Sequence, residues 1–239
     1  MKHIILKYLL FLILILYSCD SSTEVNVLPP LENIYRLNNS QVKFEIYLNL
    51  WHSKIDPIDQ NEFNLLFDTL KSVYNIYRIF YDPFDLGKYC TTGSCPEFGN
   101  NIYEGLKYII VQNEIKYSLN EYEDHRSIKT FRPQIDTDGI ILYLSNDYKE
   151  ELDAFLDVDK YQDEIRDRHI FLNTKLKIWP GHWFGWHFLT HPEVSIIYIN
   201  KDLDSATVHF RIIFQGGEAK FKRTLDKWEM IESKLTWIE

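Results

Sequence analysis

Apolar side chains recur at helical spacing in the segment that follows residue 40. Between residues 41 and 55 one helix face carries an apolar stripe, made of Phe44, Tyr47, Leu48, Trp51 and Ile55. Ser40 is placed to cap this helix, and Asp56-Pro57 ends it, because the residue before a proline avoids helical geometry. The pattern predicts a first helix over 41–55.

A second helical stripe spans residues 60 to 80. Its apolar members are Phe63, Leu66, Phe67, Leu70, Tyr74 and Tyr77. Asp59 and Glu62 have the spacing of a capping box at the start, and Asp82-Pro83 stops the pattern. We expect one long helix there, followed by a loop over 84–104.

Shorter apolar runs then indicate strands. The runs 108–111 and 115–119, joined by Gln112-Asn113, predict one hairpin. The runs 127–132 and 140–144, turning near 136–139, predict another. Two further helices are expected, at 146–156 with Ser145 as cap and at 160–173 with Asp159 as cap.

The C-terminal part alternates with period two. Ala206, Val208, Phe210, Ile212 and Phe214 alternate with polar neighbours, as in a half-buried strand. Gly216-Gly217 is a hairpin signal, Phe221 and Leu225 lie on the return strand, and Asp226-Lys227 leads into a last strand over 228–237.

This C-terminal meander resembles the end of nuclear-transport-factor-like, cystatin-like domains. The resemblance rests on Ile196-Ile197-Tyr198-Ile199-Asn200, the long strand to Phe214, Gly216-Gly217 and the end from Trp228 to Trp237-Ile238-Glu239. It implies an α+β fold in which N-terminal helices pack on a curved, cone-like antiparallel sheet. It carries over no catalytic motif, and it leaves 84–145 as an elaboration of a single domain over 33–239.

The N-terminus has the zones of an export signal. Lys2 and Lys7 precede an apolar run over 9–16, which is shorter than the ~20 residues of a membrane span. Leu16-Tyr17-Ser18-Cys19 resembles the bacterial lipobox, although Tyr17 departs from the small residue usual there. The resemblance implies a signal peptide over 1–18, a lipid anchor on Cys19, a flexible tether over 19–32 and a place in the cell envelope. A plain secretory signal with an incidental cysteine is the alternative.

Charge limits the partners of the mature chain. The leader holds two of the 26 basic residues and none of the 35 acidic ones, which leaves 24 basic residues and a net charge of −11. A chain this acidic does not bind nucleic acid or anionic lipid through bulk charge.

Two further cysteines, Cys90 and Cys95, stand in a loop rich in Gly, Ser and Thr. Paired cysteines of exported proteins usually form a bridge, so a disulfide is the expected state. Free thiols and a role in metal binding are the alternatives, but two cysteines cannot complete a zinc site by themselves.

The segment 179–192 concentrates aromatic and histidine side chains. His182, His187 and His191 do not form a helical zinc motif, because prolines and glycines interrupt the segment. On a strand, Trp183, His187 and Leu189 would share one face, and Trp186 and Phe188 the core-facing one. The first three are therefore the candidate pocket residues. Two acidic clusters, at 136–139 and 200–204, resemble calcium loops but fit turns better.

No nucleophile elbow, dinucleotide fingerprint or phosphate loop occurs in the sequence. We therefore expect an envelope-anchored, non-catalytic binding or interaction module without a cofactor, whose partner is an apolar small molecule or an envelope protein. The alternative is a small-molecule enzyme of the cone type, such as an isomerase, dehydratase or hydrolase, with His187 as its proton-transfer group. Whether the protein is an enzyme is left open by the sequence.

Overall fold

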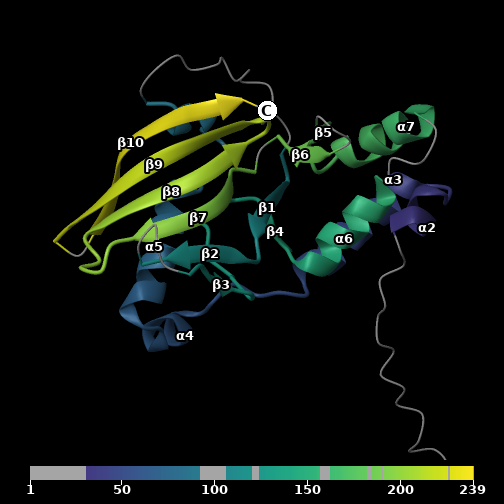
Figure 1. Cartoon of the computed structure of the whole chain (residues 1–239). Coiled ribbons are helices and arrows are strands. Elements are labelled where there is room, and N and C mark those ends of the chain that lie inside the picture. Colours follow the sequence, from purple (N-terminus) through teal and green to yellow (C-terminus); the bar gives the residue numbers. More distant parts are fainter. Residues whose placement is uncertain are drawn as a thin grey trace, which may run out of the picture.

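The computed structural model describes residues 31–91, 106–119, 124–156, 162–181, 185–189, 191–225 and 227–238. The fold is α+β, as predicted (Figure 1). The helices are α2 (Leu31–Tyr35), α3 (Ser40–His52), α4 (Gln60–Leu65), α5 (Asp68–Phe80), η1 (Leu86–Tyr89), α6 (Asn146–Phe155) and α7 (Gln162–Asn173). The strands are β1 (Tyr108–Gln112), β2 (Ile115–Ser118), β3 (Arg126–Ile128), β4 (Ile140–Leu144), β5 (Ile178–Pro180), β6 (Trp186–Phe188), β7 (Glu193–Ile199), β8 (Ser205–Ile212), β9 (Gln215–Thr224) and β10 (Lys227–Ile238).

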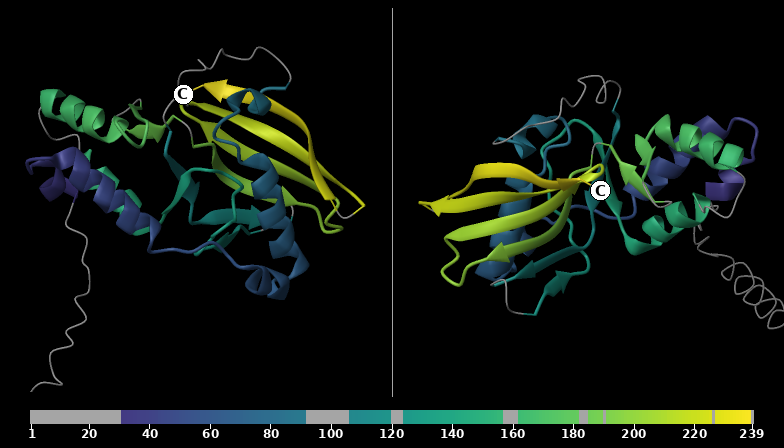
Figure 2. Two further views of the ribbon diagram at one scale, coloured as in Figure 1. Left: turned by 180° about the vertical axis from the view of Figure 1, so that it is seen from behind. Right: turned by 45° about the horizontal axis from the view of Figure 1, so that its top comes forward.

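The largest sheet has six strands in the order β10-β9-β8-β7-β2-β3. Strands β7 to β10 form an antiparallel meander, and β2 joins it parallel to β7. Helix α5 lies across one face of this sheet (Figure 2). Its buried side chains, among them Val73, Tyr77 and Phe80, pack with the inward residues of β8 and β9. We call this cluster the sheet core.

A second hydrophobic cluster, which we call the helical core, joins α2, α3, α6, α7, β5 and β6. The parallel pair β1–β4 separates the two cores. Ile109 and Val111 of β1 face the sheet core, whereas Tyr108 and Ile110 face the helical core. A strand that is buried on both faces reads as a continuous apolar run, which explains the sequence Tyr-Ile-Ile-Val.

Helix α3 covers the open edge of β4. The Trp51 indole nitrogen donates to the carbonyl of Tyr143 at 2.8 Å, and His52 Nδ1 lies 2.8 Å from the carbonyl of Ile141. Phe44, Tyr47, Leu48 and Trp51 are buried, so the inner stripe predicted for this helix is confirmed. Side chains of α3 thus supply polar partners that a two-stranded sheet would lack.

The single helix predicted over 60–80 is wrong in one respect, because the chain breaks at Leu66 and Phe67. Both residues have extended backbone, with ψ of 150° and 154°. Phe67 is consequently 82% exposed instead of lying in the apolar stripe. The predicted cap is present, since the Asp59 carboxylate accepts from the backbone N–H groups of Asn61 and Glu62.

Both hairpins predicted between residues 108 and 144 are wrong in their pairing. The strands form, but β1 pairs in parallel with β4, and β2 pairs with β3 and β7. Gln112 and Asn113 lie where the chain passes from the small sheet to the large one. Asn113 donates to the carbonyl of Phe131 and its own carbonyl accepts from Phe131 N–H, which leaves no two-residue turn at this point.

The glycine pair Gly216-Gly217 lies inside β9 and does not form the turn. The β8–β9 turn falls at Ile213 and Phe214, and Ile213 has a φ of 55°. A Cβ atom at Gly217 would stand 2.5 Å from the carbonyl oxygen of Lys234 and from the ring of Phe210. The glycines are therefore required by close packing within the sheet.

Two predicted helix caps are wrong, because Ser40 is the first residue of α3 with Asn39 before it, and Ser145 precedes α6 without a side-chain hydrogen bond to the helix. Helices α6 and α7 occupy the predicted segments, and β8 alternates buried and partly exposed residues. Leu225 is 93% exposed in the β9–β10 turn, so its assignment to the return strand is wrong. Asn200 and Asp204 hydrogen-bond to each other in the β7–β8 turn, which confirms a structural role for 200–204. Within the described ranges, no helix is both long and apolar enough to cross a membrane.

Candidate functional site

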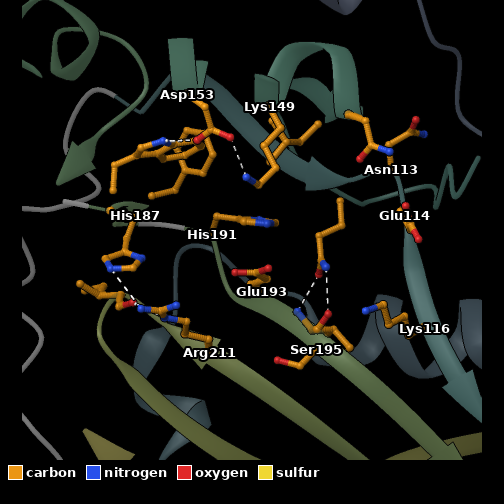
Figure 3. A pocket seen from close by; sticks show the side chains of 18 of the residues that line it. Asn113, Glu114, Lys116, Lys149, Asp153, His187, His191, Glu193, Ser195 and Arg211 are labelled. Carbon is orange, nitrogen blue, oxygen red and sulfur yellow. Dashed lines mark hydrogen bonds and ion pairs between the residues drawn. The ribbon is translucent and has the colours of Figure 1, made fainter. Parts of the chain in front are cut away.

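A cleft of about 970 Å³ opens between the two cores (Figure 3). Its walls come from the β1–β2 corner, helix α6, strand β6 and the adjoining ends of β7 and β8. Twelve of its lining side chains are polar or charged: Gln112, Asn146 and the ten that the figure labels, namely Asn113, Glu114, Lys116, Lys149, Asp153, His187, His191, Glu193, Ser195 and Arg211. The cleft therefore offers hydrogen bonds and charges more than apolar surface.

Gln112 joins the two cores beneath this cleft. Its side-chain amide donates to the carbonyl of Val194 at 2.9 Å, and its amide oxygen accepts from the Val194 N–H at 2.6 Å. A side chain thus reproduces a pair of backbone ladder bonds between β1 and β7. The register of β7 shifts between Val194 and Ile196, and Ser195 at this bulge is exposed on the cleft side.

One wall holds His187 against Arg211. A terminal guanidinium nitrogen of Arg211 lies 3.1 Å from His187 Nε2. Because arginine can only donate, Nε2 is the acceptor in this contact. Gly181 makes this wall possible, since a Cβ atom there would stand 2.4 Å from His187 Nε2. The guanidinium also donates through Nε to the carbonyl of Ile213 at 3.1 Å and lies over the ring of Trp237.

Another part of the lining is built by α6 and by Trp186 of β6. Asp153 accepts from the Trp186 indole nitrogen at 2.8 Å and from Lys149 Nζ at 2.9 Å. Lys149 also lies over the Trp186 ring, at 5.9 Å from its centroid. These contacts hold the indole plane at the cleft surface and neutralise the charges of Asp153 and Lys149 against each other.

Glu193 is the carboxylate at the floor of the cleft. It has no ion pair within 4 Å in the part of the chain that the structure describes, although its side chain is open to the cleft. The surrounding protein raises the pKa of Glu193 by desolvation, and the charges of Arg211 and Lys149 oppose this shift. Glu193 is therefore a group whose ionisation a ligand can change.

His191 lies beside the floor with its ring packed between Tyr81 and Phe188. Burial lowers its pKa to about 4, so the ring is neutral at ordinary pH. Nδ1 is buried without a hydrogen-bond partner among the described residues. A His with so low a pKa is a poor proton acceptor near neutrality, and burial keeps Nδ1 away from a ligand in the cleft.

Lys116 is the cationic counterpart of Glu193. It is exposed at the cleft and makes no ion pair within the described ranges, whereas Glu114 beside it is already held by Lys129 and Ser127. The lining therefore presents one cation and one carboxylate that the described chain does not neutralise by an ion pair.

Of the three candidate pocket residues, His187 lines the cleft. Leu189 packs against the sheet core and does not line this cleft. Its backbone turns after β6, with its N–H donating to the carbonyl of Lys177, so the strand alternation stops there. Trp183 lies outside the described residues, as do Phe184 and His182. Phe188 is buried in the helical core, as predicted, whereas Trp186 packs against that core and also lines the cleft.

Sequence reasoning missed Glu193, Arg211, Lys149, Asp153 and Lys116 as cleft residues. They come from four separate elements, and the mispaired hairpins concealed that β2, β7 and α6 meet. The lipid-anchor residue Cys19 and the bridge partner Cys95 lie outside the described residues. Cys90 is buried directly after η1. Because Cys95 is not among the described residues, the Cys90–Cys95 disulfide stays a prediction.

No family model matches the chain, and comparison with curated proteins and with solved structures gives no match. Among the described side chains, no group of three or more His, Cys, Asp or Glu is arranged to hold a metal ion.

Proposed function

We propose that this protein is an envelope lipoprotein, anchored through Cys19, that binds a polar small molecule in the cleft between its two cores without converting it. The observation that carries this proposal is the cleft itself, in whose lining Glu193 and Lys116 make no ion pair with any residue that the structure describes. Charged groups in a concave site are the usual determinants of ligand orientation and specificity.

The lining favours a particular ligand chemistry. Glu193 can accept from an ammonium or hydroxyl group, and Lys116 can pair with a carboxylate or phosphate. The Trp186 ring, oriented by Asp153, offers a flat surface at the same cleft. A dipolar molecule with both charges fits this arrangement better than the apolar ligand that the sequence suggested.

Enzymatic activity is the second candidate, and one observation favours it. Glu193 has a raised pKa, as general acids and bases in active sites often have. The His187 side chain accepts from Arg211, which makes it a weaker candidate for proton transfer than the sequence implied. The cone-like closure that the C-terminal resemblance implied belongs to this second proposal.

A ligand panel tests the binding proposal. Zwitterionic, anionic, cationic and neutral compounds are added to the protein while NMR records the indole N–H signal of Trp186. We expect zwitterions to shift that signal most, and we expect Glu193→Gln and Lys116→Gln each to weaken binding about tenfold, equal to about 1.4 kcal/mol. Lys54→Gln, an exposed lysine outside the cleft, is the control and should change nothing.

The two candidate functions separate on the fate of the bound compound. A binding module returns its ligand unchanged after prolonged incubation, as followed by mass spectrometry. Turnover that disappears in Glu193→Gln while binding persists would instead establish the enzymatic alternative.

The anchor is tested separately by cell fractionation. Cys19→Ala should release the protein from the membrane fraction and abolish labelling by a radioactive fatty acid. Retention of both properties in the variant would reject the anchor and leave the cleft proposal untouched.

A further inference from the structure

Helix α3 is apolar on two sides, although only one side faces the core. Its inner stripe, from Phe44 to Trp51, is buried. On its outer side, Val42 is 62% exposed and Ile46 is 54% exposed, and Leu50 is half-buried one turn further on. Residues four apart lie on one line along a helix, so these three form a continuous outer stripe.

Helix α2 widens this stripe into a shallow groove of about 230 Å³. The groove is lined by Ile34, Leu37, Lys43, Ile46, Tyr47 and Leu50. Leu37, between the two helices, is 45% exposed. Lys43 is the only charged side chain among these lining residues, and it is exposed. A soluble surface has little reason to gather four partly exposed aliphatic side chains in one place.

The position of this face identifies its partner. Helix α2 is the first element of the described chain, and Leu31 stands 12 positions after Cys19. Twelve residues span at most about 40 Å when fully extended. A lipid on Cys19 therefore keeps the α2–α3 end of the molecule close to the bilayer.

We propose that the outer α2–α3 face, made of Leu37, Val42, Ile46 and Leu50, rests in the interfacial layer of the membrane to which Cys19 holds the protein. The proposal relies on the lipid anchor and is independent of the ligand in the cleft. The apolar side chains enter the boundary between headgroups and acyl chains, and Lys43 extends its ammonium group to the headgroups.

Because the lipid on Cys19 already holds the protein at the membrane, a weak contact of the outer α2–α3 face is enough to orient it. A patch of four aliphatic residues does not hold an acidic protein on a membrane by itself, because one acyl chain already gives only marginal binding. A short tether turns the docking into an intramolecular event with a high effective concentration. The face thus orients the molecule on the membrane and presents the cleft at a fixed height.

The experiment uses the full lipidated chain in vesicles of phosphatidylethanolamine and phosphatidylglycerol. The photoreactive residue p-benzoylphenylalanine replaces Val42 or Ile46. In matched controls it replaces Leu65 at the end of α4 or Phe67 just after it, which are 86% and 82% exposed. Figure 1 shows that α4 lies away from α2 and α3. After irradiation, mass spectrometry counts lipid adducts on each peptide.

We expect at least fivefold more lipid adduct at positions 42 and 46 than at 65 and 67. Ile46→Glu should lower the adduct at position 42 severalfold, while the protein still floats with the vesicles and unfolds at an unchanged temperature. Equal lipid adduct at all four positions would overturn the proposal. Adducts to residues 19–30 of the same chain would also overturn it, because the tether would then cover the face. A chain that does not float with the vesicles would reject the anchor, and with it this proposal, but not the cleft.

Discussion

The two cores are assembled in different ways from the same chain. The sheet core rests largely on strands that are neighbours in sequence, because β7, β8, β9 and β10 follow one another as hairpins. The helical core collects α2 and α3 from residues 31–52 and α6 and α7 from residues 146–173, and it depends on the parallel pairing of β1 with β4. The parallel pair β1–β4 therefore joins a sheet core built mainly from contacts between neighbouring strands to a helical core built from contacts between distant segments.

The cleft lies where these two structures meet. Its floor belongs to β7 and β8 of the sheet, whereas its walls include α6 and β6 of the helical side. Gln112 and the alternating side chains of β1 fix the distance between them. The shape of the candidate site is therefore a consequence of how the cores are joined.

The largest expected effect comes from removing a large buried aromatic side chain from either core. Trp51→Ala and Phe210→Ala should each destabilise the protein by about 3 to 5 kcal/mol, because both are buried and leave a cavity. Chemical denaturation measures the change. If the cores are one cooperative unit, both variants still unfold in a single transition. Val42→Ala is the exposed control and should cost less than about 0.5 kcal/mol.

The next effect concerns the ion pairs that hold α2 in the helical core. Arg168 is fully buried and contacts Glu32 at 2.5 Å, Glu164 at 2.8 Å and the carbonyl of Phe155 at 2.7 Å. Its removal takes the buried cation away from Glu32 and Glu164, which still contact the exposed Arg36 at 2.6 and 3.7 Å, and it leaves a cavity, so Arg168→Ala should cost about 2 to 4 kcal/mol. Differential scanning calorimetry tests this, and a loss below about 0.5 kcal/mol would contradict it.

His191 should make stability depend on pH. Its folded pKa of about 4 lies below its ordinary 6.5, so the unfolded chain binds the proton first as pH falls. Stability from this residue is present above pH 6.5 and is lost between pH 6.5 and 4, by about 2 to 3 kcal/mol. The raised pKa of Glu193 acts in the opposite direction and reduces the net slope. His191→Phe should remove the loss, and Glu193→Gln should steepen it, as measured by denaturation at each pH.

The smallest effect separates the two glycines of β9. At Gly217 a methyl group would meet the backbone carbonyl of Lys234, which cannot move freely, so Gly217→Ala should cost about 1 to 3 kcal/mol. At Gly216 it would meet the half-exposed ring of Trp237 near the C-terminal end, which can turn away. Gly216→Ala should therefore cost less, and thermal unfolding that ranked the pair in reverse would contradict this packing account.

The sequence predicted the locally formed elements well and the long-range strand pairing poorly. Helical stripes such as that of α3 and the alternation of β8 are local, so the sequence sufficed to place them. The pairing of Tyr108 with Ile140 is parallel and crosses a long connection, and no local signal distinguishes it from a hairpin. The glycine pair was misassigned because close packing against Phe210 and a turn both call for glycine.

The site was predictable only in part for the same reason. His187 was accessible to sequence reasoning because it lies in a conspicuous aromatic segment. Glu193 and Lys116 are ordinary charged residues on strands, and only the parallel register of β2 with β7 places them at one cleft. Their importance arises from tertiary structure, which alternation alone does not encode.

The central claim is that β1 joins both cores into one unit with the cleft between them. Native-state hydrogen exchange on Ile110→Ala tests it most directly, because Ile110 faces only the helical core. The substitution should lower the opening free energy of the slowest amides in α3 and in β8 by the same amount, about 2 to 5 kcal/mol. Lowered values in α3 with unchanged values in β8 would show that the cores open independently and would contradict the account.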